Sequence, residues 1–332
     1  MKNILLIAGL QERYYFGPFV DACSGLEIRI HIFDPSLFPD EAEMHIVQDL
    51  DGSISGYIDT VLLQPEDQIE HVRLPLSEIH AAWYVRENHR PRSSTMLNDL
   101  ESRFIQNESR QALRALLTTL DCTWVNSRES IERVNSNKLY QQTLAARCGL
   151  KIPRTLISNS PEEIIRFAEK EQGVLLKSMG YIRLDDEGKL ALYSEHFSLT
   201  EIQESAAAIR CCPIYCQTYV QKRFEHRVMV IGSKVLSCRI DSQASDKTKV
   251  DWRHYDFKNV EHRQVELPQD LKERLTRFMQ AADLRYGAID LIEEPNGDYV
   301  FLEVNPSGQW GWIADLAGIP VAEAVANLLE SI

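Results

Sequence analysis

Two carboxylates and one amide near the end of the chain are the side chains best placed to do chemistry together. Asp290 precedes the dipeptide Asn296-Gly297, and Glu303 and Asn305 follow it. An Asn-Gly pair between two apolar runs is a strong signal for a β-hairpin. With these two residues as the turn, Asp290 lies directly opposite Glu303. Asn305 then points to the same face as Glu303, because side chains alternate along a strand.

The hairpin face that carries Asp290 and Glu303 has two interpretations. Like charges directly opposite each other on a sheet repel, so something must offset them. Two carboxylates and an amide oxygen suit a hard divalent cation that keeps water ligands free for phosphates. The alternative is an acidic face that water alone solvates. The spacing leaves both interpretations open.

Three cationic side chains could complement an anionic ligand near such a cation. Lys177 ends the apolar run 174–176, and Lys138 directly follows Asn137. A lysine ammonium acts on phosphate as a point charge. An arginine such as Arg227 can bind phosphate or carboxylate through two parallel hydrogen bonds. The alternatives are lysines whose stems are buried while their charges reach water, and an ordinary exposed strand arginine.

Arg227 lies in a second predicted hairpin. With Gly232-Ser233 as its turn, Arg227 pairs with Cys238 and Arg239 pairs with His226. Arg227 and Arg239 then face opposite sides of the sheet. At most one of them reaches a given pocket unless a bulge intervenes.

Several familiar catalytic patterns do not occur in the sequence. There is no G-x-x-x-x-G-K-[ST] phosphate loop, no G-x-G-x-x-G and no H-E-x-x-H zinc motif. Segment 52–56 has Ile54 where a nucleophile elbow needs serine. The nine histidines lack ligand spacing, and the seven cysteines include no C-x-x-C pair. We therefore expect reduced thiols in a cytoplasmic protein.

The overall composition excludes several classes of protein. With 332 residues, 44% hydrophobic and 26% charged, the chain is neither disordered nor fibrous. A net charge of −13 makes it a poor partner for a nucleic-acid backbone. Its N-terminal apolar run, residues 4–10, is too short to cross a membrane and lacks a signal-peptide cleavage site. We therefore expect no nucleic-acid partner and no membrane partner.

The elements that must position these side chains form an α/β pattern. In the first third we expect strands at 4–8, 27–33 and 79–85, a turn at 51–53 and a helix near 100–120. A helix at 139–148 has Asn135 or Ser136 as its cap and Gly149 at its end. Another helix begins at Ser160, with Glu163 closing a capping box.

The rest of the chain mixes strands and helices. We expect strands at 173–178, 190–193 and 214–220, a turn at 185–188 and a helix at 198–210. In the last third we expect strands at 227–231, 234–240, 288–293 and 299–305, and a helix at 271–284.

The order and spacing of these features resemble the ATP-grasp superfamily over roughly residues 126–332. The series runs Asn137-Lys138, Lys177, 217–220, Glu225-x-Arg227, Asp290 and Glu303-x-Asn305. Within the superfamily, the chain is most similar to microviridin-type ATP-grasp peptide ligases, the graspetide synthetases. That similarity rests on residues 301–312, on 240–243 followed by Asp251-Trp252-Arg253, and on 124–126.

This resemblance implies an α/β (α+β) ATP-grasp fold with ATP and Mg²⁺ as cofactors. It divides the chain into an N-terminal α/β domain (1–125), a small central subdomain (126–212) and a C-terminal domain with a mixed or antiparallel sheet (213–332). The implied nucleotide-binding residues are Lys138, Lys177, Gln217, Thr218, Tyr219, Val220, Glu225 and Leu302. The implied metal ligands are Asp290, Glu303 and Asn305, and the implied catalytic residues are Arg227 and Arg239.

Two positions depart from the superfamily pattern. Lys177 is followed only by Ser178-Met179-Gly180, in place of a longer Gly-rich loop. Ala288 stands where enzymes such as D-alanine–D-alanine ligase carry an arginine. It is therefore open which groups cover the phosphates and stabilise the tetrahedral intermediate.

The resemblance implies an ATP-dependent ligase that acts on a ribosomally made precursor peptide, leader plus core. It would activate Asp or Glu side chains as acyl phosphates and close macrocyclic esters or amides. The alternative is a RimK-like or glutathione-synthetase-like ligase that joins separate molecules. A third hypothesis, a nucleotide-binding regulator without catalysis, conflicts with the complete Asp290, Glu303 and Asn305 set.

The sequence does not locate the site for the leader peptide. Trp83, Arg86 and Glu87 are candidates, and packing between domains is the alternative role for them. The oligomeric state is also open, with a homodimer as the common default.

Overall fold

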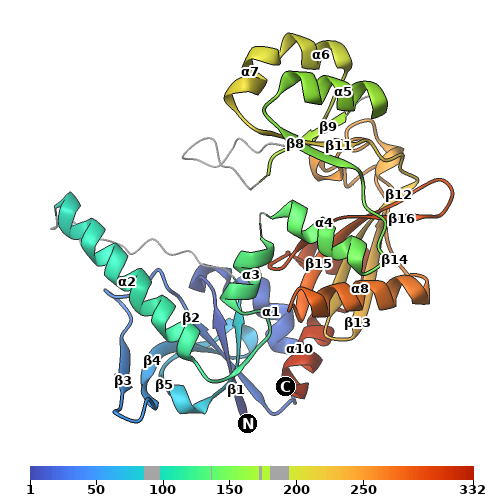
Figure 1. Ribbon diagram of the computed structural model, residues 1–332. Helices are drawn as coiled ribbons and strands as arrows, with labels where there is room; N and C mark the ends of the chain where they lie inside the picture. Colours follow the sequence, from blue (N-terminus) through green and yellow to red (C-terminus); the bar gives the residue numbers. More distant parts are fainter. Residues whose placement is uncertain (86–97, 136, 172–173, 180–193) are drawn as a thin grey trace. The chain divides into compact units, whose positions relative to one another are not determined.

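The computed structural model describes residues 1–85, 98–135, 137–171, 174–179 and 194–332. The chain divides into two compact units, which Figure 1 shows in sequence colours. The first unit comprises Met1–Ile131, Leu284–Tyr286 and Pro320–Ile332, and the second comprises Glu132–Asp283 and Gly287–Ile319. The division into three domains, at 125/126 and 212/213, stays a prediction.

One sheet forms the centre of the first unit. Its strands are β1 Lys2–Ile7, β2 Ile28–Phe33, β3 Met44–Gln48, β4 Ile54–Leu63, β5 Ile69–Pro75, β6 Ile79–Tyr84 and β7 Thr123–Trp124. They follow the order β3-β4-β2-β1-β6-β7, with β5 paired to β4. Strands β1, β2, β6 and β7 are parallel, and β3, β4 and β5 pair antiparallel. The predicted strands at 4–8, 27–33 and 79–85 and the turn at 51–53 are confirmed.

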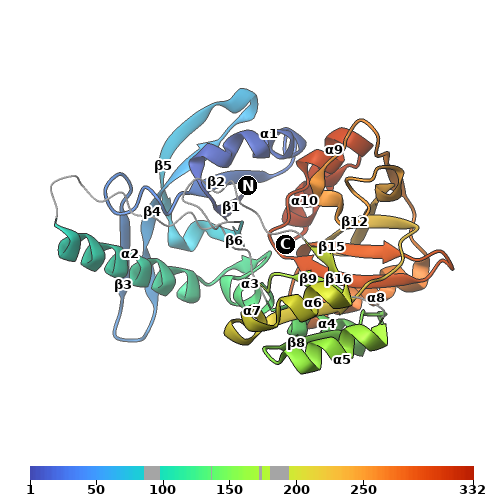
Figure 2. The same cartoon turned by 90° about the horizontal axis from the view of Figure 1, so that it is seen from above.

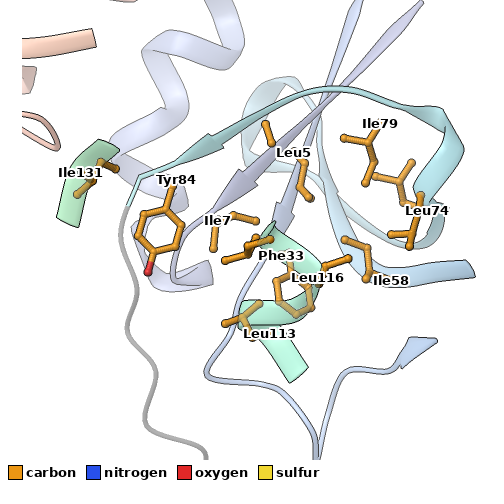
Figure 3. Packing of buried hydrophobic residues seen from close by; sticks show 13 residues of the cluster. Leu5, Ile7, Phe33, Ile58, Leu74, Ile79, Tyr84, Leu113, Leu116 and Ile131 are labelled. Carbon is orange, nitrogen blue, oxygen red and sulfur yellow. The ribbon is translucent and has the colours of Figure 1, made fainter. Parts of the chain in front are cut away.

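Helices pack on this sheet. They are α1 Arg13–Ala22, α2 Asp99–Thr119 and α10 Val321–Ser331, with short 3-10 turns at Leu10–Glu12, Pro65–Asp67 and Leu76–Glu78. Leu113 and Leu116 of α2 pack with Leu5 and Ile7 of β1 in one buried cluster (Figure 3). β1 is apolar without alternation from Ile4 onward because both of its faces are covered, as is usual for a parallel strand.

The second unit contains a four-stranded sheet in the order β10-β9-β11-β8. Its strands are β8 Thr155–Ser158, β9 Val174–Lys177, β10 Glu195–Phe197 and β11 Ile214–Thr218. Helices α5 Pro161–Glu171, α6 Leu199–Glu204 and α7 Ala206–Cys211 lie together beside it (Figures 1 and 2). Ile164, Ile202 and Ile209 of these helices form one core with Val174 and Cys216 of the sheet.

The second unit also contains a five-stranded sheet in the order β14-β13-β12-β15-β16, in which β12–β13, β13–β14 and β15–β16 pair antiparallel. Its strands are β12 Phe224–Ile231, β13 Lys234–Ile240, β14 His262–Val265, β15 Tyr286–Glu293 and β16 Tyr299–Asn305. The remaining helices are α3 Arg128–Val134, α4 Lys138–Arg147, α8 Gln269–Ala281 and α9 Gly311–Ala317, with 3-10 turns at Ser242–Ala244 and Trp252–His254. Phe278 of α8 packs against Phe301 of β16, with ring centroids 4.8 Å apart, so α8 backs the hairpin that carries the candidate metal ligands.

Local predictions in the second unit needed three corrections. α4 is capped by Asn137, whose Oδ1 accepts the N–H of Tyr140 at 3.2 Å, and not by Asn135 or Ser136. Ser160 caps α5, but its own N–H donates to Ser158 Oγ at 2.9 Å, so Glu163 does not close a capping box. The helix predicted at 198–210 is two helices, α6 and α7, which meet at Ser205.

The other predicted strands and helices of this unit occur within three residues of their expected bounds. The predicted turn at 185–188 and strand at 190–193, together with Ser136 and Gly180, lie outside the described residues. Among the helices that the structure describes, none combines the length and apolar character needed to cross a membrane.

Candidate active site

The hairpin β15–β16 places Asp290 opposite Glu303, as predicted, but by a different route. The turn is longer than the expected dipeptide: the N–H of Glu294 donates to Asp298 O at 2.8 Å, and Gly297 adopts φ 86°. The pairing next to the turn is therefore offset by one residue, with Glu293 opposite Tyr299. An irregularity after Asp290 restores the predicted register. The predicted two-residue turn was wrong, and the predicted carboxylate pair is confirmed.

The extra residue of this bulge is Leu302. Strict alternation would send Leu302 and Glu303 to opposite faces of the sheet. Both instead line one cavity, together with Asp290 and Ile292 of the facing strand. The bulge thus places an apolar side chain beside the paired carboxylates, which is a common use of bulges next to active sites.

The cavity lies entirely within the second unit. It is formed by the ends of β9, β11, β12, β15 and β16, the start of α4 and residues 250–253. Its lining includes nine of the thirteen predicted site residues: Lys138, Lys177, Gln217, Thr218, Val220, Glu225, Asp290, Leu302 and Glu303. Side chains that the sequence separates by more than 160 positions therefore share one cavity.

Lys138 and Glu303 form an ion pair in this cavity. Lys138 Nζ lies 3.0 Å from Glu303 Oε2, and their side chains are 19% and 30% exposed. Burial alone would raise the pKa of Glu303, but the nearby charges of Lys138, Lys177 and Arg253 lower it to about 2. Burial also lowers the pKa of the Lys177 ammonium to about 8, even though Glu303 opposes this shift. Glu303 is thus ionised at neutral pH within a group of cations.

Arg227 and Asp290 form a second, more deeply buried ion pair. Arg227 Nη1 lies 3.0 and 3.2 Å from the two carboxylate oxygens of Asp290. Burial raises the pKa of Asp290, and Glu303 adds to this rise, while Arg227 opposes it. Arg227 Nε is buried and has no hydrogen-bond partner among the described residues. The guanidinium therefore keeps one donor that its protein partners do not use.

Gly308 lets the chain pass close to this arginine. A Cβ at Gly308 would lie 2.7 Å from Arg227 Nη2 and 2.3 Å from the Cβ of Ala288. Any larger side chain at either position would have to displace the loop or the guanidinium. Ala288, one of the departures from the superfamily pattern, is thus matched to Gly308 in this chain.

Three predicted site residues take other places. Arg239 lies on the opposite face of the sheet from Arg227, as the register argument predicted, with its guanidinium 4.1 Å from the centre of the Phe224 ring. Asn305 is exposed, and its Oδ1 accepts the N–H of Ser307 at 2.9 Å. The Tyr219 ring lies 5.8 Å from the ring of His196.

Apolar side chains also line the cavity. They include Leu175 of β9, Val220 just after β11 and Leu302 of β16. Gln217 is buried, and its side-chain amide donates to Tyr215 Oη at 2.9 Å and Thr155 Oγ1 at 3.1 Å. Gln217 therefore braces the strand beside the apolar lining by joining β11 to β8.

Comparison with known proteins decides what this site belongs to. The family of RimK-like ATP-grasp domains matches residues 135–329, which is more than half of the chain and contains all the residues of the cavity. The chain is a member of the RimK-like ATP-grasp family. No curated protein matches the chain in sequence.

Solved structures agree with this ATP-grasp fold over the whole chain. A RiPP-associated ATP-grasp ligase from Chryseobacterium gregarium, in complex with ADP and a leader and core peptide, is 23% identical with a TM-score of 0.86, covering 99% of this chain and 96% of that one. Macrocyclase MdnB from Microcystis aeruginosa MRC is 25% identical with a TM-score of 0.75, covering 99% of each chain. ATP-grasp ligase PsnB, complexed with a phosphomimetic variant of its minimal precursor, Mg and ADP, is 17% identical with a TM-score of 0.74, covering 100% and 98%.

The cavity of this ATP-grasp domain fits the cofactors that the fold implies. Asp290 and Glu303 offer oxygen ligands of the kind that Mg²⁺ prefers, and Lys138, Lys177 and Arg227 supply positive charge for phosphates. The apolar side chains of the lining fit a planar base. Among the described residues, no three His, Cys, Asp or Glu side chains are placed to hold a metal ion together, so the candidate metal set has only two carboxylates.

The sequence analysis missed two features of the ATP-grasp cavity. Lys222 Nζ lies 3.0 Å from Glu225 Oε1, both side chains are under 7% exposed, and the ammonium also donates to Val250 O at 2.6 Å. A lysine three residues before Glu225 was the only signal in the sequence. Asp251 and Arg253 had been noted as part of a similarity but without a role.

Asp251 holds Arg253 in the cavity wall. The Arg253 guanidinium binds both carboxylate oxygens of Asp251, one of them from Nε at 2.8 Å. Burial would raise the pKa of Asp251, but these bonds lower it below its usual range. Asp251 also accepts the N–H of Ser194 at 3.2 Å. This bond links residues 250–253 to the start of β10.

Of the three candidates for the leader site, the structure describes only Trp83. Trp83 is only 3% exposed, with its ring 4.9 Å from that of Tyr286 and 6.5 Å from that of Phe19. Trp83 therefore packs inside the first unit, to which Phe19 and Tyr286 also belong. Arg86 and Glu87 lie outside the described residues.

Proposed function

We propose that this ATP-grasp protein is a peptide ligase of the microviridin or graspetide type. It would use ATP to activate Asp or Glu side chains of a ribosomally made precursor peptide and close ester or amide rings. The observation that carries the proposal is the cavity in which Asp290 and Glu303 face each other beside Lys138 and Lys177, with Arg227 bound to Asp290. The RiPP ligase and macrocyclase folds, which match nearly the whole chain, support the peptide as substrate.

The reaction explains the charges in the cavity. A carboxylate must first become an acyl phosphate before a hydroxyl or amine can displace phosphate from it. Both steps place negative charge on phosphoryl and acyl oxygens, and fixed cations stabilise such charge best where water is excluded. Removal of one group of this kind costs about 3–4 kcal/mol of barrier in comparable sites.

Each residue then has a role that its position supports. Lys138 and Lys177 would bind the phosphates, and Leu175, Val220 and Leu302 would hold the base. Mg²⁺, when bound, would supply a Lewis acid between nucleotide and carboxylates. Asp290 and Glu303 would hold that ion, with Asn305 as a third ligand once its oxygen leaves the Ser307 N–H.

Arg227 would bind the acyl phosphate, because it keeps an unused buried donor beside Asp290. A catalytic role for Arg239 is not carried into this proposal. Its position on the far face of the sheet separates it from the cavity.

A reconstituted reaction tests the proposal. The purified chain is incubated with ATP, Mg²⁺ and the full-length precursor encoded beside it. We expect ADP release together with loss of one water per ring in the mass of the peptide. The matched control is Glu303→Gln, which keeps the shape of the side chain but removes the charge. A verified native precursor whose mass does not change would contradict the proposal.

A ligase that joins separate molecules is the second candidate, because the matching family is named for RimK-like domains. It would use the same nucleotide and metal residues, so only the acceptor differs. In that case the peptide product gains the mass of the second substrate. A regulator without catalysis would instead bind ATP without turnover, and Glu303→Ala would leave its function intact.

The setting of the reaction completes the proposal. We propose a cytoplasmic location, a leader-plus-core peptide as partner, no nucleic-acid or membrane partner, and three domains divided near 125/126 and 212/213. A homodimer is a further proposal, which sedimentation of the purified chain tests directly.

A further inference from the structure

The oxygen ligands proposed for a divalent cation already have protein partners. Lys138 Nζ lies 3.0 Å from Glu303, and Arg227 Nη1 lies 3.0 Å from Asp290. Asn305 Oδ1 accepts a backbone N–H. The same two cations, Lys138 and Arg227, are those assigned to phosphate and acyl phosphate. The ligands for the metal and the ligands for the anion are thus paired with each other.

The charges that line the cavity balance without any ligand. Four cationic side chains, Lys138, Lys177, Lys222 and Arg253, stand against four carboxylates, Glu225, Asp251, Asp290 and Glu303. Arg227, paired with Asp290 beside this lining, adds a fifth positive charge. A divalent cation alone would add two positive charges and would leave Lys138 and Arg227 without their carboxylates. Uncompensated buried charge is strongly unfavourable. A nucleotide removes this obstacle, because its phosphates offer the displaced cations new partners.

We propose that in the free protein the metal ligands are paired with the phosphate-binding cations, Glu303 with Lys138 and Asp290 with Arg227. A divalent cation therefore binds only together with nucleotide. The inference rests on the proposed function for the assignment of nucleotide and metal to this cavity. In the exchange, two protein ion pairs are replaced by two carboxylate–metal contacts and two cation–phosphate contacts. The two opposite-charge contacts of the free protein thus become four, and both ligands are needed so that no buried charge is left unpaired.

Mn²⁺ binding by the full-length chain tests this exchange without any turnover. The paramagnetic resonance signal of free Mn²⁺ disappears on binding, so the bound fraction is measured directly. For the wild type we expect weak binding of Mn²⁺ alone and tight binding with ADP. This result alone is not decisive, because ADP itself is a metal ligand.

The decisive measurement is Mn²⁺ binding without nucleotide by variants at Lys138. Lys138→Met removes the positive charge that is paired with Glu303. We therefore expect Mn²⁺ to bind about tenfold more tightly than to the wild type, within the usual range of coupling between sites. Lys138→Arg keeps the charge and should bind Mn²⁺ as weakly as the wild type. The double variant Lys138→Met/Glu303→Gln should lose the gain, because the released ligand is gone.

Lys222→Met is the matched control for general electrostatics. It removes one positive charge from the same cavity, but its partner Glu225 is not a proposed metal ligand. We expect less than about a threefold gain in Mn²⁺ affinity from it, well below the coupling expected for Lys138. Should this variant not fold, Lys222→Gln replaces it, since it removes the same charge and can still donate a hydrogen bond to Glu225. An equal gain in Lys138→Met and in the control would overturn the inference.

ADP binding distinguishes a failure of this inference from a failure of the proposed function. If the wild type binds ADP with Mn²⁺ but Lys138→Met shows no gain for Mn²⁺ alone, only this inference fails. If ADP binds neither with nor without Mn²⁺, the proposed function fails, and this inference fails with it.

Discussion

Strands β1 and β12 are both interior strands of their sheets, and both are almost entirely buried. They differ in the polarity of the side chains that they bury. From Ile4 to Ile7, β1 buries only aliphatic side chains. β12 buries Glu225, His226 and Arg227 in succession before its apolar half begins. From Ile4 onward, β1 thus buries apolar side chains alone, whereas β12 also buries polar and charged ones.

The buried polar side chains of β12 each have a partner outside the strand. Glu225 is held by Lys222, His226 by Glu293 and Arg227 by Asp290. Buried ion pairs are weak evidence for stability, because desolvation opposes the attraction between the charges. Their concentration on one strand therefore marks the place where the fold serves a ligand.

Breaking one buried ion pair of β12 should cause the largest predicted loss of stability. Asp290→Leu leaves the Arg227 guanidinium buried without its carboxylate, so we expect a loss of about 3–5 kcal/mol in the free energy of unfolding. Urea titration of the purified chain measures it. The double variant Asp290→Leu/Arg227→Met should recover most of this stability while remaining inactive. A double variant as unstable as the single one would show that the pair itself stabilises the fold.

The matched change in β1 should separate stability from activity. Leu5 is completely buried, so Leu5→Ala should lower the free energy of unfolding by about 2–5 kcal/mol. At temperatures where the variant is folded, the rate per folded molecule should equal that of the wild type. A changed KM for ATP in folded Leu5→Ala would argue against this separation.

The pH dependence of activity should report the charged region alone. Burial lowers the pKa of Lys177 to about 8, so its ammonium is lost as pH rises through that value. We expect kcat/KM for ATP to fall about tenfold per pH unit above pH 8, since this parameter reports the free protein. Lys177→Arg, which stays protonated, should remove the fall if it retains activity. A wild-type profile that is flat to pH 10 would contradict the role of Lys177.

The lowered pKa of Lys177 also predicts how the stability of the fold changes with pH. Because the pKa of Lys177 is depressed in the folded state, the unfolded chain binds this proton more tightly between pH 8 and its ordinary pKa. The contribution of Lys177 to stability is therefore unfavourable below pH 8 and improves as pH rises above it. Urea titrations of the wild type and Lys177→Met across this range should differ in slope, with the wild type gaining relative to the variant.

The sequence predicts the parts of this molecule that short-range rules control. The two-residue turn at Gly232-Ser233 fixes the register of β12 and β13, and every predicted partner there is confirmed. The separation of Arg227 from Arg239 follows from that register alone. The cavity residues that came from family resemblance, such as Leu302, depend on a series of motifs rather than on any local rule.

The sequence could not predict features for which neighbouring residues are nearly equal alternatives. It also could not predict contacts with backbone that is distant in the sequence. Asn135, Ser136 and Asn137 can all cap a helix, so local preference cannot choose the start of α4. The bulge at Leu302 compensates for a turn one residue longer than expected, and neither error is visible without the other. The partner of Lys222 includes the carbonyl of Val250, which no local pattern connects to it.

The smallest predicted effect comes from an arginine of the first unit with the same kind of partner as Arg227. Arg73 lies 3.2 Å from Asp59 and 2.8 Å from Glu43, but its side chain is 53% exposed. Water already solvates these charges, so Arg73→Met should change the free energy of unfolding by less than about 1 kcal/mol, and less at high salt. A loss as large as that of Asp290→Leu would mean that burial is not what distinguishes the two pairs. The contrast between β1 and β12 would then need a cause other than desolvation.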